Sequence, residues 1–387
     1  MNLYEYQAKE ILAQYGVPIP EGGVAGSAEE AEARARGLAA EEYAVKAQIH
    51  AGGRGLVGGV RLAATPKNVR TIASELIGSK LVTPQTRKEG EPVNLVYVEG
   101  AVDSAQDYFI AVLVDQATSE LVVLGSKDGG VDFEERVQKD PGIVSALPIP
   151  VDGEPSEAAA TAFLQELGVA TDLQPRFREI LSALARVFVK IDATLVEVNP
   201  LTVTPDGAVY AVDAKVSLDN NARYRHPELE LLAEETVGDA VELQAQSHEI
   251  NLVTLDGNIG LVVNGAGLAL ATQDMVIDAG GKPANFMDIR TTATSLQVAR
   301  GIGLLLADPK IKVLLVNIHG GGMTTCDTVA EALAFAMVHA KREVPVVFRA
   351  AGQNAEYAKT MLNSRRVPHV LADSISEAIE RAIAIAA

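Results

Sequence analysis

The sequence predicts an α/β protein of two domains: a mixed α+β domain over residues 1–240 and a doubly wound parallel sheet over residues 241–387. Three observations favour this fold class. The chain has 387 residues, which is enough for two domains with buried cores. After residue 258, short apolar runs alternate with helical segments, an order typical of a parallel sheet covered by helices on both faces. Before residue 240 the pattern is less regular.

The first domain is expected to mix helices and strands. Apolar residues recur at helical spacing over residues 2–15, and a second helix begins at the capping box of Ser27. A third helix begins at Thr65, where Thr precedes Pro, and ends at Gly78. The runs rich in β-forming residues are 43–48, 93–99, 108–114 and 121–124.

The second domain is expected to form the parallel sheet. Its apolar runs are 259–263, 284–288, 313–317, 344–348 and 370–371, and helical segments separate them. In such sheets, ligands bind beyond the carboxyl ends of the strands. The loops of interest therefore follow Val263, Asp288, Asn317 and Phe348.

Composition excludes several classes of protein. Hydrophobic residues make up 48% of the chain and charged residues 22%, which is typical of a folded globular protein. The formal charge is −18 and there is no Trp, so a nucleic-acid partner is not expected. One Cys excludes an internal disulfide and a Cys-based zinc site. With no apolar stretch of membrane-spanning length and no signal-like start, the sequence predicts a cytoplasmic protein without a membrane partner.

A glycine-rich segment follows the run 43–48. Residues 52–59 contain five glycines, and Lys46 and Arg54 add positive charge. Closely spaced glycines let backbone N–H groups approach phosphate oxygens, so the segment is interpreted as a lid over a nucleotide. The alternative is a surface hairpin with incidental basic residues. The segment is not a Walker A motif, because no Gly-Lys-Ser/Thr opens a helix.

A second pattern predicts a β-hairpin around Asp206. A turn at Pro-Asp-Gly places Asn199 opposite Asp213, so that an amide oxygen and a carboxylate can converge. Such hard oxygen ligands suit Mg²⁺ bound beside phosphates. Glu197 lies two residues before Asn199 and is expected on the same face of the strand. The alternative is a solvent-facing polar row on an edge hairpin.

Two glycine turns follow strands of the second domain, at residues 264–268 and 319–327. A glycine turn before a helix can bind an anion, but it is also found as a simple tight connection. Asp288 lies at a spacing that suits a dinucleotide fold, but Leu270 occupies a position where that fold needs Gly or Ala. A nicotinamide-dependent oxidoreductase is therefore a weaker alternative.

With these residues in place, the chain resembles the β subunit of succinate–CoA ligase over nearly its whole length. The matching blocks are residues 2–10, 46–55, 197–201, 213–215, 255–269 and 283–286. The resemblance implies an ATP-grasp domain followed by a flavodoxin-like ligase domain. It also implies Mg²⁺, ATP and CoA, and a partner α subunit that binds CoA and carries a phosphorylated histidine, in an αβ or α₂β₂ assembly.

The resemblance also implies roles for particular residues. The nucleotide site would comprise Lys46, Gly53, Arg54, Gly55, Glu99, Val102 and Asp107, where Asp107 replaces the usual Glu. Asn199 and Asp213 would hold Mg²⁺, and Glu197 would meet the histidine of the α subunit as the catalytic residue. The acid would be bound by Asn264 and by the turn Gly320, Gly321, Gly322 and Met323.

Three segments depart from the family pattern, and all follow strands of the second domain. Where the family has three glycines and an alanine, this chain has Arg290, Thr291, Thr292 and Ala293. His319 replaces a phenylalanine, and Thr325 replaces an arginine in a turn that is one residue longer. Residues 349–352 lose a carboxylate. Because the nucleotide positions are almost unchanged, the departures predict a change of acid specificity.

The replaced residues offer charged and hydroxyl donors. Arg290 and its flanking threonines, with Thr324 and Thr325 opposite, suit a tetrahedral oxyanion. Sulfoacetate is therefore the leading candidate for the acid, and succinate or malate are the alternatives. A further alternative is that the chain is not catalytic and serves only as a nucleotide-binding subunit. The intact nucleotide positions argue against this alternative.

Overall fold

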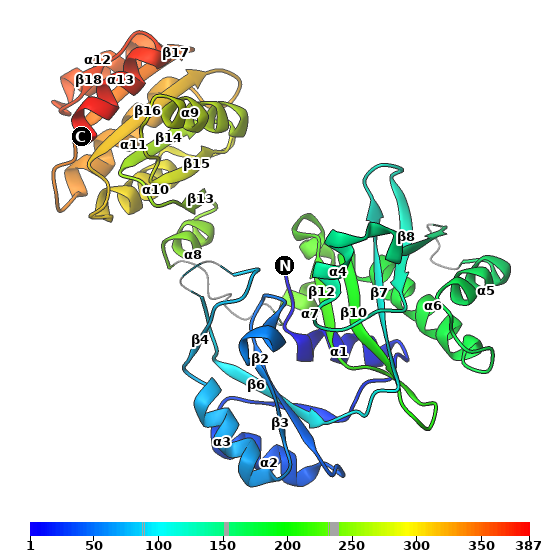
Figure 1. The fold of residues 1–387 in the computed structure, drawn as a ribbon. Coiled ribbons are helices and arrows are strands. Elements are labelled where there is room, and N and C mark those ends of the chain that lie inside the picture. Colours follow the sequence, from blue (N-terminus) through cyan, green and yellow to red (C-terminus); the bar gives the residue numbers. More distant parts are fainter. Residues whose placement is uncertain (87, 89, 151–154, 231, 233–239) are drawn as a thin grey trace. The chain divides into compact units, whose positions relative to one another are not determined.

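The computed structural model describes residues 1–387 except residues 87, 89, 151–154, 231 and 233–239 (Figure 1). The chain divides into two compact units, residues 1–236 and 237–387, which are described separately. Within the described ranges, no helix combines the length and the apolar character needed to span a membrane.

The first unit begins with a four-stranded antiparallel sheet. Its order is β1 (Gly22–Ala25), β6 (Leu95–Gly100), β2 (Tyr43–Gln48) and β3 (Val60–Ala63). Two helices pack against it, α2 (Ala28–Gly37) and α3 (Pro66–Leu76), and their N-terminal N–H groups are capped by Ser27 and Thr65 as the sequence predicts. A small ladder, β4 (Lys80–Leu81) with β5 (Glu91–Pro92), lies between α3 and β6 in the sequence.

A six-stranded antiparallel sheet completes the first unit. Its order is β11 (Val209–Ala211), β10 (Ala193–Val203), β7 (Gln106–Asp115), β8 (Glu120–Ser126) and β9 (Ser145–Ile149), and β12 (Ala214–Leu218) also pairs with β10. One face packs against α1 (Glu5–Gln14), α5 (Glu157–Glu166) and α6 (Gln174–Lys190). The other face carries α4 (Phe133–Lys139). The ring of Phe133 stacks on the ring of Phe109, with the ring centroids 3.9 Å apart. Short turns of helix at η2 (Pro141–Ile143), η3 (Asn220–Arg225) and α7 (Pro227–Glu230) fill the connections.

The first helix begins later than the sequence predicts. It was expected from residue 2, but it starts at Glu5 because the preceding residues pair with the edge of β12. The Leu3 N–H donates to the Val216 carbonyl at 3.0 Å, and the Met1 ammonium donates to the Leu218 carbonyl at 2.9 Å. The N-terminal segment is therefore attached to the same sheet that holds β10.

The second unit is a doubly wound sheet, and this prediction is confirmed. The strand order is β13 (Asn251–Thr254), β15 (Asn285–Ile289), β14 (Ile259–Asn264), β16 (Val313–Gly320), β17 (Val346–Gly352) and β18 (Val370–Leu371). All neighbours are parallel except β13, an antiparallel edge strand that the sequence pattern did not predict. One face packs against α9 (Ala266–Asp278) and α13 (Ile375–Ala386). The other packs against α8 (Ala240–Ser247), α10 (Ser295–Ala307), α11 (Cys326–His339) and α12 (Ala355–Ser364).

Candidate functional site

A cavity of about 430 Å³ lies in the first unit, and its walls come from both sheets and from the glycine-rich segment. The predicted site residues that line it are Lys46, Gly53, Arg54, Gly55, Glu197, Asn199 and Asp213. Four other charged or ionisable side chains also line it without having been predicted: Glu5, His50, Glu134 and Lys215. The cavity therefore brings together residues that lie up to about two hundred positions apart in the chain.

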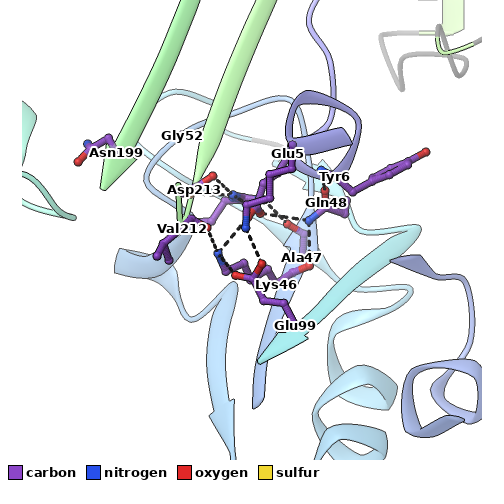
Figure 2. Close-up of polar contacts among 12 residues, drawn as sticks. Glu5, Tyr6, Lys46, Ala47, Gln48, Gly52, Glu99, Asn199, Val212 and Asp213 are labelled. Atoms are coloured by element: carbon purple, nitrogen blue, oxygen red, sulfur yellow. Dashed lines mark hydrogen bonds and ion pairs between the residues drawn. The ribbon is translucent and has the colours of Figure 1, made fainter. Parts of the chain in front are cut away.

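Lys46 is buried at the middle of β2 and points into a set of oxygen atoms (Figure 2). Its Nζ lies 2.9 Å from Glu5 Oε1 and 2.7 Å from Glu99 Oε1, and it donates to the Val212 carbonyl at 2.6 Å. Burial alone would lower the pKa of Lys46, but the carboxylates of Glu5, Glu99 and Asp213 outweigh it and raise the pKa. Lys46 is therefore a permanently charged group facing the cavity.

Arg54 is the second buried cation of the cavity and begins a single turn of 3₁₀-helix, η1 (Arg54–Val57). The preceding Gly53 has a φ of 74°, which favours glycine. The Arg54 Nη2 lies 2.8 Å from Glu5 Oε2 and 2.9 Å from Asp213 Oδ2, and Nη1 donates to the Ala47 carbonyl at 2.8 Å. Burial opposes the charge, but Asp213 and Glu5 raise the pKa of Arg54.

Lys9 completes what we call the buried charge cluster: Glu5, Glu99 and Asp213 with Lys9, Lys46 and Arg54. The Lys9 Nζ lies 3.0 Å from Glu5 Oε1 and 2.5 Å from Glu99 Oε2, and its side chain is fully buried. Burial would raise the pKa of Glu5, but Lys46, Lys9 and Arg54 hold it well below its usual value. The formal charges of the cluster cancel, which makes their burial tolerable.

The hairpin at residues 197–215 has the predicted register. Leu201 pairs with Ala211 and Glu197 pairs with Lys215, so the strands are aligned about Asp206 as the sequence predicts. The two candidate metal ligands lie opposite each other, because the Asn199 N–H donates to the Asp213 carbonyl at 3.1 Å.

The side chains of these two residues do not converge in the structure, which corrects the prediction. Asn199 Oδ1 accepts from the Gly130 N–H at 2.7 Å, whereas the Asp213 carboxylate accepts from Arg54 at 2.9 and 3.0 Å. Figure 2 shows Asn199 apart from Asp213. The physical reason is local: neither residue takes part in the regular β10 ladders, and Asp213 lies in a bend, so the shared-face rule of paired strands does not apply there.

The donor set nevertheless fits Mg²⁺. Asn199 supplies an amide oxygen, Asp213 supplies a carboxylate whose side chain is 35% exposed, and both line the same cavity. Among the described residues there is no cluster of three His, Cys, Asp or Glu side chains that could hold a metal ion. Mg²⁺ is commonly held by one or two carboxylates together with substrate phosphates, and the pair Asn199 and Asp213 suits that mode of binding.

Glu197 lies on β10 and faces the cavity. Burial raises its pKa to about 7, and the nearby carboxylates of Glu134 and Asp213 add to this effect, while Lys215 opposes it. A carboxyl group with a pKa near neutrality can take up and release a proton under ordinary conditions. Glu197 is thus suited to proton transfer at the wall of the cavity.

His50 is a cavity residue that sequence reasoning missed. Its ring stacks on Tyr4 with centroids 4.0 Å apart, and both ring nitrogens are buried without a hydrogen-bond partner among the described residues. Burial lowers its pKa to about 4, so the imidazole is neutral at neutral pH. Its position in the sequence, between β2 and the glycine-rich segment, is the feature that could have indicated that it lines the cavity.

Three predicted nucleotide residues do not line the cavity. Glu99, on β6, is buried behind Lys46 in the charge cluster. Asp107, on β7, accepts from the Thr202 hydroxyl at 2.6 Å and from the Ser104 hydroxyl at 2.7 Å. Val102 lies in the connection between these strands and is partly exposed. Glu99 can act on the cavity only through the cluster.

In the second unit, the predicted acid-binding residues gather at the carboxyl ends of β14, β15 and β16. The Thr324 hydroxyl donates to the Thr291 carbonyl at 3.1 Å and lies 3.4 Å from the Arg290 carbonyl. The loop at residues 290–293 and the turn at residues 319–325, which both differ from the family pattern, are therefore in contact. Arg290, Thr291, Thr292, Gly321, Gly322 and Met323 are exposed at this edge, and Gly320 is buried. A Cβ at Gly320 would lie 2.3 Å from the Gln353 carbonyl oxygen, so this position requires glycine.

Two of these residues already form hydrogen bonds within the domain. Thr324 is buried and its hydroxyl donates to a backbone carbonyl, so it fixes the Arg290 loop. Both ends of the Asn264 amide bond to the backbone of His319 at 2.9 Å. Asn264 therefore ties the end of β14 to the end of β16, because an amide matches the N–H and C=O of one neighbouring residue.

Comparisons with known proteins agree with this architecture. Residues 2–203 match a family model described as ATP-grasp domain, and residues 262–379 match one described as CoA-ligase. The chain is 42% identical to the succinate–CoA ligase (ADP-forming) subunit β of Acidiphilium cryptum, over 99% of this chain and 98% of that one. It is also 42% identical to the subunit of the same name from Wolinella succinogenes, over 100% and 98%.

A solved structure shows the same fold. ATP citrate lyase from Methanothrix soehngenii, in complex with citrate and coenzyme A, matches with a TM-score of 0.75 at 19% identity. The match covers 99% of this chain and 99% of that chain. At this identity the likeness shows the fold alone.

Proposed function

The chain belongs to the ADP-forming succinate–CoA ligase β-subunit family, and we propose that it binds ATP in the cavity of its first unit and phosphorylates a histidine of an α subunit. Members of this family are enzymes that use ATP and CoA and normally require Mg²⁺. The proposed reaction is ATP + acid + CoA giving acyl-CoA + ADP + phosphate. The observation that carries the proposal is the cavity shared by Lys46, Arg54, Asn199, Asp213 and Glu197.

Each of these residues has a physical task in the proposed reaction. Lys46 and Arg54 neutralise the charge of the polyphosphate, since both are buried cations on the cavity wall. Asn199 and Asp213 would hold Mg²⁺, which supplies further charge neutralisation when bound. Glu197 takes the proton of the partner's histidine, a task that its pKa near 7 suits. Apart from the proton transfer to Glu197, these residues act by positioning the substrates and by neutralising charge, as phosphoryl transfer requires.

The assembly is proposed to be an αβ or α₂β₂ heteromer in the cytoplasm. The relatives are named as β subunits, which implies an α-subunit partner. The α subunit would carry the phosphorylated histidine and most of the CoA site. The single cysteine and the charge of −18 are consistent with a reducing compartment and with no nucleic-acid partner.

The acid is proposed to be a short dianion other than succinate, with sulfoacetate as the leading candidate. The support is the contact between the loop at residues 290–293 and the turn at residues 319–325. This contact presents Arg290, Thr291 and Thr292 together at the carboxyl ends of the strands. A guanidinium with neighbouring hydroxyls suits the three oxygens of a sulfonate. The names of the relatives favour succinate, which is therefore the second candidate, with malate as a related one.

Reconstitution with the α subunit tests both the proposed phosphate transfer from ATP and the proposed identity of the acid. ADP release is measured with sulfoacetate, succinate and malate in turn, at saturating ATP and CoA. We expect kcat/KM to be highest for sulfoacetate. Succinate with much the highest kcat/KM contradicts the acid assignment alone, whereas a pair that transfers no phosphate from ATP contradicts the whole proposal.

Arg290→Ala is expected to separate acid binding from nucleotide binding. Loss of a charged hydrogen-bond donor should raise the KM for the acid by about tenfold or more. The KM for ATP should stay within about twofold, because ATP is bound in the first unit in this proposal. Steady-state kinetics with each substrate varied gives both values, and Arg300→Ala, an exposed arginine on α10, is the matched control. An unchanged KM for the acid shows that Arg290 does not contact it.

A further inference from the structure

Glu5 occupies an unusual place in the buried charge cluster. Its carboxylate lies 3.0 Å from Lys9 Nζ, 2.9 Å from Lys46 Nζ and 2.8 Å from Arg54 Nη2, and its side chain is 1% exposed. Figure 2 shows it between the helix that carries it and Lys46. Among the ion pairs of the described residues, Glu5 alone joins Lys46 to Arg54.

The other carboxylates of the cluster each hold one of these two cations. Glu99 contacts Lys46 and Lys9, and Asp213 forms its ion pair with Arg54. Without Glu5, Lys46 would be drawn towards Glu99, and Arg54 would be drawn towards Asp213. Two like charges in one cavity also repel each other, and a carboxylate between them offsets this repulsion by attracting both. Glu5 therefore determines where the two cations lie relative to each other.

The N-terminal segment fixes Glu5 in this position. Met1 and Leu3 bond to the edge of β12, and the Tyr4 N–H donates to Gln7 Oε1 at 2.9 Å, so α1 begins at Glu5. A carboxylate in the first helical turn is also favoured by the helix dipole. Asn2, Leu3 and Glu5 all line the cavity, so the start of the chain forms part of its wall.

We propose that Glu5 is a positioning residue for the nucleotide: it holds the Lys46 ammonium and the Arg54 guanidinium in the arrangement that receives the triphosphate. Lys9 balances the charge of Glu5 from the side away from the cavity, because Lys9 does not line it. The inference rests on the proposed function. It adds to that function a residue that does not itself contact the reacting atoms.

Glu5→Gln tests the proposal, because it keeps the shape of the side chain and removes its charge. We expect the Kd for ADP and the KM for ATP to rise about tenfold or more, as loss of a charge-assisted contact on both cations implies. The KM values for the acid and CoA should stay within about twofold. ADP binding is measured by calorimetry and the KM values with the reconstituted pair. Glu5→Asp keeps the charge but shortens its reach, and is expected to give intermediate values.

Leu164→Ala is the matched control for lost stability. Leu164 is fully buried in α5 and does not line the cavity, so its truncation lowers the Tm without touching the cluster. Glu5→Gln with a lower Tm but wild-type ADP affinity overturns the proposal, as does an equal loss of affinity in Leu164→Ala. If Glu5→Gln does not fold, wild-type affinity in Glu5→Asp overturns it instead. A wild-type chain that binds neither ADP nor ATP overturns the proposed function itself.

Discussion

Replacing Glu197 by glutamine is expected to lower the rate of phosphate transfer to the α subunit by about 10²–10⁴-fold, the usual contribution of a positioned proton acceptor. Glutamine keeps the size of the side chain and its place on β10 but cannot take up the proton of a histidine. Transfer of labelled phosphate from ATP to the α subunit gives the rate. ADP binding to the isolated chain should be unchanged, because Glu197 is not needed to hold the polyphosphate.

The same substitution is expected to stabilise the chain at alkaline pH. Burial raises the pKa of Glu197 from about 4.5 to about 7, so the folded state favours the protonated form. That contribution to stability is fully present below about pH 4.5 and is lost as the pH rises through about 7. Glutamine is neutral throughout, so above pH 7 the variant should be more stable by roughly 3 kcal/mol.

Thermal unfolding at pH 5 and pH 8 measures this effect. We expect the Tm of Glu197→Gln to exceed that of the wild type by several degrees at pH 8, and by much less at pH 5. Glu179→Gln is the matched control, because Glu179 is exposed on α6 and its pair with Arg176 is a surface contact. An equal gain at both pH values would show that the gain does not come from the ionisation of Glu197.

The sequence predicted the hairpin of the site but not the direction of its side chains. Alternation and the Pro-Asp-Gly turn are local features, and they were sufficient to align Glu197 with Lys215. The position of the Asp213 carboxylate depends on Arg54, which is 159 residues away in the chain. No periodic pattern carries that information, because the pairing arises only when the glycine-rich segment packs over the hairpin.

The same limit explains Glu5. Helical spacing predicted a first helix, and the structure confirms it. Spacing can indicate whether Glu5 faces the surface or the interior, but it cannot indicate which residues Glu5 contacts. Its contacts with Lys46 and Arg54 cross 41 and 49 residues of chain. The edge strand β13 was missed for a different reason: four residues are too few to show a period. Long-range pairings and short strands are therefore among the features that remained unpredicted.

Asp213→Asn is the second substitution with a large expected effect. In the proposed site Asp213 provides the only negative charge among the two metal ligands, since Asn199 is neutral. Asparagine keeps an oxygen in place but loses that charge, so the Mg²⁺ concentration for half-maximal activity should rise by about tenfold or more. We expect kcat/KM for ATP to fall by about 10²-fold, the usual effect of losing one electrostatic contact to the reacting group.

A titration with MgCl₂ at saturating ATP measures the metal requirement. Asp206→Asn is the matched control: the same chemical change at the exposed turn of the same hairpin, where no cavity residue is touched. The Tm of Asp213→Asn should change little, because Arg54 keeps its bond to Glu5 and the Asp213 side chain is 35% exposed.

ADP binding without Mg²⁺ separates the two roles that Asp213 has in the structure. If its pairing with Arg54 only holds the guanidinium, Asp213→Asn should weaken ADP binding equally with and without the metal. If it is a metal ligand, the loss should occur only with Mg²⁺, and without the metal the variant should bind ADP at least as well as the wild type, since a carboxylate facing the phosphates repels them. Because Glu5 still holds Arg54 when Asp213 is gone, the structure favours the second result.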